Sequence, residues 1–416
     1  MATTHIIGAG LAGLEAACVL VEHGRHVIIH EAARAAGGRC RSYFDQELNC
    51  RLDNGNHLLL SGNNAAMSFL KRVGAYDTLT GPTDPIFPFI DLVNLERWVL
   101  RMNHGRLPWW IFVPAMRVPH TRLRDYLALL KLRRAQTDDL VESLVGAIGP
   151  LYRNLLEPLA IAGLNTPARE ASAAPLRQVI AETIERGGAA SIPCWPREGL
   201  SESFIDPALR WLTARPTEFR SNSRVAALPR DDLQIRGIDL TDSHIDLAPE
   251  DNIILATPAP VAANLVPGVE VPDAFQAILN VHYKYHLAKG DAGFWGLIGG
   301  TAEWVFAKGD ILSVTISAAN DRIDVPADLL AAQVWQDLVR AFGVPAAMPA
   351  YRVIKEKRAT FAATPAQLAR RPGAVTKWRN LFLAGDYTNT GLPATIEGAI
   401  RSGKAAALAS LHANAG

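Results

Sequence analysis

The chain has 416 residues, of which 49% are hydrophobic and 20% charged, so it has material for a sizeable core and length for two or more domains. Its 42 lysines and arginines balance 41 aspartates and glutamates, which gives no reason to expect a nucleic-acid partner. Four scattered cysteines without a CxxC pair indicate reduced thiols in a cytosolic protein, and they argue against a disulfide framework or a zinc site. We expect no bound metal.

The sequence also argues against secretion and against a membrane span. Residues 5–7 already form a strand, which leaves no room for a signal peptide. The longest mostly apolar run, residues 107–116, is short and contains two prolines.

The N-terminus predicts a strand, a glycine loop and a helix. After the strand at residues 5–7, Gly8, Gly10 and Gly13 follow with the GxGxxG spacing, and a helix continues to Gly24. Gly8 would allow the tight turn, Gly10 the approach of a pyrophosphate, and Gly13 the close packing of helix on strand. The pattern predicts a dinucleotide-binding unit.

A second strand at residues 27–29 ends at Glu31, which lies 18 residues after Gly13. A carboxylate at this distance can accept hydrogen bonds from ribose hydroxyls. Gly37 and Gly38, followed by Arg39, predict a second approach of backbone and positive charge to phosphate.

Residues 52–60, LDNGNHLLL, raise the question of a turn or a site. Asn54-Gly55 would suit a hairpin turn. A histidine at the start of a leucine run is not needed for a turn, and His57 could donate a proton at the rim of a cavity. The alternative is that His57 only hydrogen-bonds the turn or a cofactor.

Residues 101–134 hold eight lysines and arginines against one acid, Asp125, together with Trp109, Trp110, Ile111 and Phe112. Aromatic and cationic side chains together suit the interface of an anionic membrane. An arginine-rich loop over an ordinary core is the alternative.

The middle of the chain, residues 76–214 and 261–374, is predicted to be helical and apolar around a long cavity. Two helices are expected, at residues 175–187 and at residues 328–342 before Gly343.

The C-terminus predicts a strand at residues 381–384, then Gly385 and Asp386, and a helix from about Thr395. Small residues give that helix a thin face suited to packing against a flat ring or sheet. Its N-terminus would present N–H groups to an electron-rich acceptor.

These motifs resemble the FAD-binding pattern of the amine oxidase and phytoene desaturase superfamily. The resemblance implies an α/β fold: a Rossmann-like FAD-binding domain from residues 1–75, 215–260 and 375–416, and an α+β, helix-rich substrate domain from residues 76–214 and 261–374. It implies FAD contacts by Gly8, Gly10, Leu11, Ala12, Gly13, Glu31, Ala32, Gly37, Gly38, Arg39, Asn54, Gly55, Asn56, His57, Val225, Gly385, Asp386, Thr395, Ile396 and Ala399.

The DNGxH element and residues 303–319 also resemble the hydroxysqualene dehydroxylases. That resemblance implies loss of an allylic hydroxyl from a squalene-length polyprenoid and its replacement by hydride from reduced flavin, as part of squalene and hopanoid biosynthesis. His57 is the first candidate for the acid and Asp53 the second catalytic candidate. A substrate this insoluble implies a cytoplasmic enzyme in peripheral contact with the inner face of a membrane.

Three alternatives remain open on the sequence. A polyene desaturase or an amine oxidase would use the same cofactor, and a prenyl-lipid carrier would have lost it; Glu31 and the Gly385-Asp386 element favour retained FAD. No second dinucleotide fingerprint is present, because GLIGGT at residues 296–301 has the wrong spacing. The electron donor is therefore expected to be a separate molecule.

Overall fold

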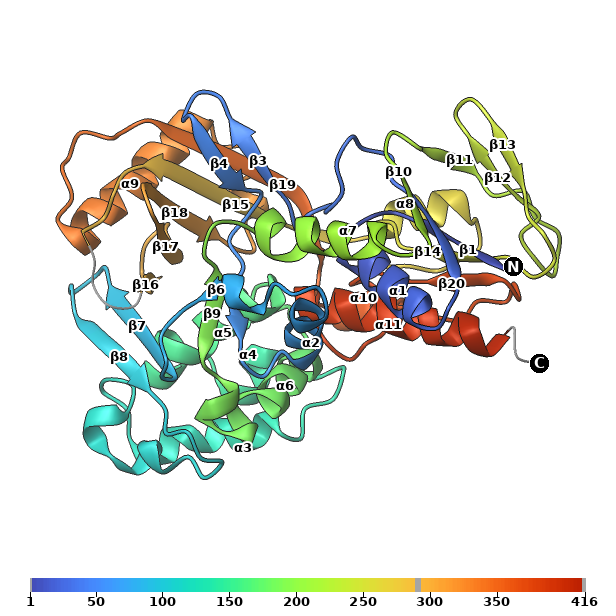
Figure 1. Cartoon of the computed structure of the whole chain (residues 1–416). Coiled ribbons are helices and arrows are strands. Elements are labelled where there is room, and N and C mark those ends of the chain that lie inside the picture. The colour runs from blue at the N-terminus through green and yellow to red at the C-terminus, as the bar shows by residue number, and fades with distance from the viewer. Residues whose placement is uncertain (1, 289–292, 414–416) are drawn as a thin grey trace.

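A five-stranded parallel sheet forms one half of the computed structural model, which describes residues 2–288 and 293–413 (Figure 1). The strand order is β10-β2-β1-β14-β20, and every neighbouring pair is parallel. The strands are β1 (Thr3–Ile7), β2 (His26–His30), β10 (Thr217–Arg220), β14 (Asn252–Leu255) and β20 (Leu381–Leu383). Three distant parts of the chain therefore build one sheet, as the glycine motifs at both ends predict.

Helices α1 (Leu11–Glu22) and α11 (Ile396–Ala413) pack together beside this sheet (Figure 1). The thin face of α11 contacts α1, because a Cβ atom on Gly403 would lie 2.1 Å from the carbonyl oxygen of Ala12. At this position the small residues serve helix packing, not contact with a flat ring. Three further helices belong to this half: α2 (Asn64–Arg72), α7 (Asp206–Thr213), which packs on α1, and α8 (Ala259–Leu265). A small antiparallel sheet joins β11 (Val225–Ala227), β12 (Gly237–Leu240) and β13 (His244–Asp246).

A seven-stranded mixed sheet forms the other half, with the order β19-β15-β18-β17-β16-β7-β8. Its strands are β7 (Ile86–Asp91), β8 (Arg97–Arg101), β15 (Phe275–Lys284), β16 (Phe294–Ile298), β17 (Trp304–Lys308), β18 (Ile311–Ile316) and β19 (Tyr351–Phe361). One face is apolar and is covered by α9 (Ala327–Phe342), in a core that includes Leu279, Val281, Val314, Val334 and Leu338. The other face meets the first half of the molecule.

The prediction of a helical segment over residues 261–374 is wrong, because five of the seven strands lie there. Their sequences, such as FQAILNVHYK, alternate polar and apolar residues with the period of a strand that has two different faces. The helix predicted at residues 328–342 is confirmed, and Gly343 ends it with a φ of +66°. The helix predicted at residues 175–187 is shorter: α6 (Ala173–Glu182) begins after the capping residue Ser172 and ends before residue 183.

The remaining helices are short: α3 (Leu127–Leu132), α4 (Val141–Val145), α5 (Glu157–Leu164) and α10 (Pro365–Ala369). Two small sheets pair β3 (Ser42–Asp45) with β4 (Cys50–Asp53), and β9 (Pro193–Pro196) with both β5 (Leu59–Leu60) and β6 (Leu79–Thr80). No helix among the described residues is long and apolar enough to cross a membrane.

Residues 54–58 do not form a hairpin turn. They connect β4 to β5, which belong to different sheets, and they pass over the polar part of the seven-stranded sheet. The loop therefore lies where the two halves of the molecule meet.

Candidate functional site

The glycine loop after β1 is shaped by contacts that a side chain would not permit. Gly8 has a φ of +106°, and a Cβ atom there would lie 2.6 Å from the carbonyl oxygen of Ala256. A Cβ atom on Gly13 would lie 2.0 Å from the carbonyl oxygen of Gly8, so glycine is needed for α1 to pack this closely. Gly10 has no atom within 4 Å of its Cβ position. This open space at the N-terminus of α1 fits a phosphate group.

Glu31 is held in a fixed orientation by the backbone. Its Oε2 accepts a hydrogen bond from the N–H of Ala9 at 2.9 Å, and its Oε1 from the N–H of Ala33 at 2.8 Å. Each carboxylate oxygen retains a lone pair for a ribose hydroxyl. The N–H of Ser223 donates to the Glu31 carbonyl oxygen at 2.8 Å, which brings the strand of Val225 beside the end of β2.

The second glycine pair folds back onto the first loop. The N–H of Gly37 donates to the carbonyl oxygen of Ala9 at 2.8 Å. A Cβ atom on Gly38 would lie 3.7 Å from the Cα atom of Gly10, and both glycines of the pair have positive φ. The two loops thus form one continuous backbone surface.

Arg39 connects this surface to the C-terminal motif. Its Nη2 donates to Oδ1 of Asp386 at 2.7 Å. The N–H of Gly385 donates to Oγ of Ser402 on α11 at 2.8 Å, and Oγ1 of Thr395 accepts the N–H of Gly398 at 3.0 Å to cap that helix. The N-terminal and C-terminal motifs therefore converge on one place.

Two residues that lie beside Gly385, Thr257 and Tyr387, carry buried hydroxyl groups that have no partner among the described residues. Burial raises the pKa of Tyr387, so its hydroxyl stays protonated. A buried hydroxyl without a hydrogen bond costs free energy, so both groups favour a polar ligand at this position. Together with the open space beside Gly10 and the oriented Glu31, they fit a bound dinucleotide.

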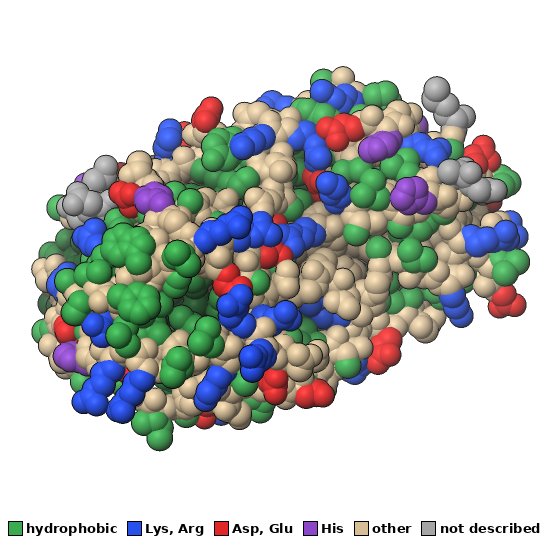
Figure 2. Space-filling model, turned by 90° about the horizontal axis from the view of Figure 1, so that it is seen from below, with side chains coloured by type: hydrophobic (Ala, Val, Ile, Leu, Met, Phe, Trp, Pro, Cys, Tyr) green, Lys and Arg blue, Asp and Glu red, His purple; other side chains and the backbone are tan. Residues whose placement is uncertain are grey.

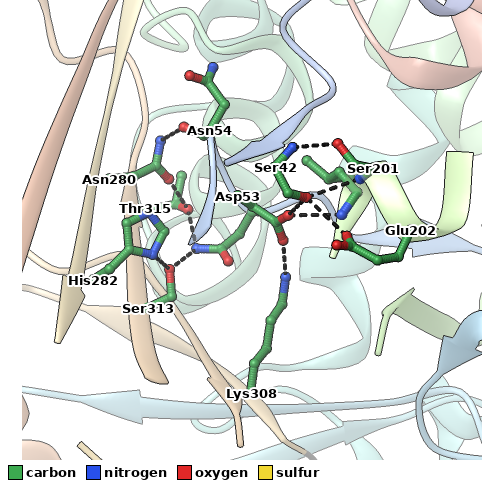
Figure 3. Close-up of polar contacts among 12 residues, drawn as sticks. Ser42, Asp53, Asn54, Ser201, Glu202, Asn280, His282, Lys308, Ser313 and Thr315 are labelled. Atoms are coloured by element: carbon green, nitrogen blue, oxygen red, sulfur yellow. Dashed lines mark hydrogen bonds and ion pairs between the residues drawn. The ribbon is translucent and has the colours of Figure 1, made fainter. Parts of the chain in front are cut away.

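Asp53 joins the two halves of the molecule (Figure 3). Its Oδ2 forms an ion pair with Nζ of Lys308 at 2.8 Å. Its Oδ1 accepts hydrogen bonds from Oγ of Ser42 at 2.7 Å and from the N–H of Leu200 at 2.8 Å. Burial alone would raise the pKa of this carboxyl, but Lys308 and the other donors hold it below its usual value. Asp53 is therefore an ionised acceptor with every oxygen engaged.

The asparagines after Asp53 bind the polar part of the seven-stranded sheet (Figure 3). Nδ2 of Asn280 on β15 donates to the carbonyl oxygen of Asn54 at 3.3 Å. Nδ2 of Asn56 donates to Oγ of Ser313 at 2.7 Å and to Oγ1 of Thr315 at 3.0 Å, both on β18. Side chains of β15 and β18 therefore hold the loop against the sheet.

Gly55 allows the close approach of Asn280, whose Nδ2 would be 3.0 Å from a Cβ atom there.

Two histidines lie in this region. Burial lowers the pKa of His57 to about 4 and the pKa of His282 to about 4. Nδ1 of His282 hydrogen-bonds Oγ of Ser313 at 2.7 Å, and its buried Nε2 has no partner among the described residues. Both imidazoles are neutral at pH 7, which makes each a weak proton donor.

Aromatic side chains continue the same face of the sheet away from the polar row. Phe306 on β17 pairs with Ser313 and with Phe294, and Trp304 pairs with Thr315, so all share one face. The Phe294 ring lies 6.4 Å from Trp304 and 5.3 Å from Trp195. The face thus changes from hydrogen-bonding groups at the loop to aromatic rings.

A pocket of about 240 Å³ lies between this aromatic face and α5. Phe89 and Trp304 line it from the sheet, Glu157 and Ile161 from the helix, and Glu303 from the start of β17. The volume is smaller than the roughly 300–1,000 Å³ of a typical drug-sized ligand site, so it would hold a part of a long molecule.

The chain matches a sequence model of flavin containing amine oxidoreductases over residues 11–285 and 302–409. The chain belongs to this family. The chain is therefore a flavin-containing oxidoreductase with FAD as its cofactor, in agreement with the fold and cofactor predicted from the sequence.

Two relatives are similar over the whole length. The hydroxysqualene dehydroxylase of Rhodopseudomonas palustris is 45% identical over 410 residues, which cover 97% of both chains. That of Zymomonas mobilis is 44% identical over 98% of both chains. Among solved structures, an oxidoreductase from Methanosarcina mazei has a TM-score of 0.74 at 16% identity, covering 97% of this chain and 99% of its own, which shows the same fold.

The structure brings the predicted residues into two connected groups, while their individual roles stay predictions. Gly8 to Gly13, Glu31, Gly37 to Arg39 and the start of α11 surround the dinucleotide site, and residues 53–57 form the loop above the sheet. The sequence did not single out the sheet residues that hold this loop, which are Asn280, His282, Lys308, Ser313 and Thr315. Polar residues at alternate positions of otherwise apolar strands, as in NVH and SVT, are the signal that indicates them.

Proposed function

We propose that the protein removes the allylic hydroxyl of hydroxysqualene and replaces it with hydrogen, giving squalene in squalene and hopanoid biosynthesis. The similarity to hydroxysqualene dehydroxylases over nearly the whole chain carries this proposal. A polyene desaturase or an amine oxidase is less favoured. The carotene desaturases match only 18% to 37% of the chain, and the amine oxidases that share the fold are only 16% to 18% identical.

FAD, when bound and reduced, supplies the hydride. The N-terminus of α1 and the Gly37-Gly38 loop would hold its pyrophosphate, and Glu31 would hold a ribose. Asp386 and the N-terminus of α11 would hold the middle of the cofactor. The unpartnered hydroxyls of Thr257 and Tyr387 offer further hydrogen bonds to it.

The aromatic face suits the other half of the reaction. Breaking the C–O bond of an allylic alcohol leaves a cation, and the π-faces of Trp304 and Phe306 can stabilise positive charge that develops nearby. The same rings exclude water, which would otherwise capture the cation. The apolar surface also suits a hydrocarbon chain.

In this scheme Asp53 positions the loop and does not donate a proton. A carboxylate with a lowered pKa that accepts three hydrogen bonds has no proton to give at neutral pH. Neutral His57 can hydrogen-bond the cofactor or the substrate hydroxyl, and its pKa of about 4 makes it a poor acid. The electron donor is a separate molecule.

Anaerobic turnover tests the function. The FAD-loaded protein is reduced, hydroxysqualene is added in detergent, and squalene is measured by mass spectrometry while the flavin absorbance is followed. We expect squalene to form in step with flavin reoxidation. If neither hydroxysqualene nor any other allylic alcohol reoxidised the flavin, the proposal would be refuted. Reduction of the oxidised flavin by a carotenoid precursor would support a desaturase, and reduction by an amine would support an amine oxidase. A colourless protein that cannot be loaded with FAD would point to a carrier.

We further propose that the segment of residues 101–134 binds an anionic membrane. Residues 101–134 expose an apolar patch, made of Leu107, Trp109, Phe112, Leu123, Leu127 and Leu130. Hydrophobic and basic side chains gather around a hollow in the left half of Figure 2, at the end of the molecule where residues 100–150 lie in Figure 1. Trp110, which the sequence grouped with this patch, is 3% exposed and packs against Tyr126 in the core.

Vesicle binding tests this contact. A variant with Trp109→Ala and Phe112→Ala should lose at least about tenfold in affinity for phosphatidylglycerol vesicles, because it buries less apolar area. Leu233→Ala with Val375→Ala, which removes comparably exposed apolar side chains elsewhere, is the control. Equal binding of both variants and the unmodified protein would contradict the proposal.

A further inference from the structure

Glu303 lines the pocket at the end of the aromatic face and is rigidly held. It precedes β17, and its carbonyl oxygen accepts the N–H of Leu297 at 2.7 Å. The preceding residues of the same hairpin, Thr301 and Ala302, donate their N–H groups to Oδ2 of Asp337 on α9 at 2.6 and 3.0 Å. The position of Glu303 is therefore fixed by the sheet on one side and by α9 on the other.

The Glu303 carboxyl has few groups that stabilise its anion. Its Oε2 accepts a hydrogen bond from the N–H of Ser317 at 2.8 Å, and the Ser317 side chain also stabilises the carboxylate. No cation among the described residues forms an ion pair with it. Burial raises the pKa of Glu303 to about 7, against the opposing effects of the Ser317 N–H and of Arg322. A large fraction of the Glu303 carboxyl groups is thus protonated at neutral pH, whereas both histidines of the loop region are then in their neutral, weakly acidic form.

The sheet register places this pocket next to the loop at residues 54–57. Asn280, which contacts the Asn54 carbonyl, pairs with Thr315, and Thr315 pairs with Trp304. Adjacent strands are about 4.8 Å apart, so Trp304 lies about 10 Å across the sheet from Asn280. The reacting carbon would lie between these two positions, with its hydroxyl directed toward Glu303 and the rest of the polyprenoid chain along the apolar face.

We infer that Glu303 is the general acid that protonates the departing hydroxyl. The inference rests on the function proposed above. The Glu303 proton moves to the hydroxyl oxygen, the C–O bond breaks with its electron pair on oxygen, and water leaves. The allylic cation that remains lies against the aromatic face and takes the hydride that reduced flavin supplies, so alcohol, proton and hydride become hydrocarbon and water. The Glu303 carboxylate recovers its proton from solvent.

Glu303→Gln tests the role, because glutamine keeps the acceptor for the Ser317 N–H and lacks the acidic proton. With hydroxysqualene, we expect the rate of a single turnover to fall at least about 100-fold, the usual contribution of a general acid. With the corresponding allylic fluoride, whose leaving group departs without prior protonation, the variant should stay within a few-fold of the unmodified protein. Glu170→Gln, which affects only the exposed pair with Arg169 away from the pocket, is the matched control and should leave both rates nearly unchanged.

The pH profile gives a second readout. The unmodified protein should lose its rate with the alcohol as the pH rises above about 7, since Glu303 then loses its proton, whereas the fluoride should show no such loss. Other charged groups near Glu303 are Arg153 and Glu157 in the pocket, and Asp321 and Arg322 after β18. Glu170→Gln should keep this loss, because it leaves all of these groups in place.

Three outcomes separate the possibilities. A Glu303→Gln variant that binds FAD and converts the alcohol at the unmodified rate would overturn the inference. An equal loss with alcohol and fluoride would also overturn it, because the residue would then act on structure and not on protonation. If the glutamine variant fails to bind FAD, Glu303→Asp decides: a slower rate that keeps the same pH dependence supports the acid, and a pH-independent rate refutes it. Failure of the unmodified protein to convert hydroxysqualene would instead refute the proposed function.

Discussion

The dinucleotide site and the seven-stranded sheet hold their polar residues in different ways. In the dinucleotide site most contacts come from the backbone: Gly8, Gly10 and Gly13 act through the absence of a side chain, and Glu31 is oriented by two N–H groups. On the sheet the contacts come from side chains on separate strands, such as Asn280 on β15 and Ser313 on β18.

This difference decides how each region tolerates change. In the dinucleotide site the backbone atoms pack closely around the glycines. A methyl group added to a glycine is therefore harmful only where a neighbouring atom already occupies its position. On the sheet the polar side chains hydrogen-bond one another, so removal of one partner leaves the other buried without a hydrogen bond. The loop at residues 53–57 is held in both ways. Its glycine makes room for a side chain of the sheet, and its Asp53 pairs with Lys308.

Lys308→Met should give the largest loss of stability. It leaves the Asp53 carboxylate buried without its cation, where the side chains are only 5% and 11% exposed. Breaking a buried pair costs about 3–5 kcal/mol, which urea denaturation of the FAD-loaded protein would measure. Arg236→Met, which breaks the exposed pair with Asp231, should change the stability very little, because solvent screens that pair. Similar losses in both variants would contradict the importance of burial.

The pH dependence of stability should change in the same variant. Lys308 and the other donors hold the pKa of Asp53 below its usual value, so the pair stabilises the fold above the unfolded pKa and that contribution is lost as the pH falls through the lowered pKa. Without Lys308 the pKa of Asp53 rises, and its protonation should begin at higher pH. Midpoints of denaturation measured between pH 3 and pH 7 would detect the shift.

Gly13→Ala and Gly10→Ala should separate folding from cofactor binding. Alanine at position 13 would place a Cβ atom 2.0 Å from the Gly8 carbonyl oxygen, so α1 must move, at a cost of about 1–3 kcal/mol even without FAD. Alanine at position 10 meets no protein atom within 4 Å, so the stability without FAD should be unchanged. Its methyl group should instead weaken FAD binding, measured by titration of the apoprotein. A loss of apoprotein stability in Gly10→Ala would contradict this division.

The sequence predicts the first region well because each of its requirements is local. The spacing of Gly8, Gly10 and Gly13 and the distance to Glu31 follow from one strand, one turn and one helix. The sheet depends on register between strands far apart in the chain, such as Asn280 with Thr315, which spacing along one strand does not contain. The prediction of helices at residues 261–374 failed because the polar–apolar alternation covers only part of strands such as β15. Apolar runs such as AIL within it are not distinguished from a buried helix by periodicity alone.

The aromatic face gives the smallest of these effects and the one tied most directly to chemistry. Trp304→Leu keeps an apolar side chain in the pocket and removes the π-face from the site where we propose that the cation forms. Desolvated cation–π interactions contribute about 2 kcal/mol, so the rate of hydroxysqualene conversion should fall about tenfold to thirtyfold while substrate binding changes little.

Trp295 provides the matched control, because it lies on the adjacent strand and faces α9, with its ring 5.1 Å from Phe342. Trp295→Leu should lower stability and leave the rate nearly unchanged. If Trp304→Leu lowered affinity without lowering the rate of a bound substrate, the aromatic face would serve only to bind hydrocarbon. The cation would then depend on other groups for its stabilisation, and the two faces of the sheet would differ in packing alone.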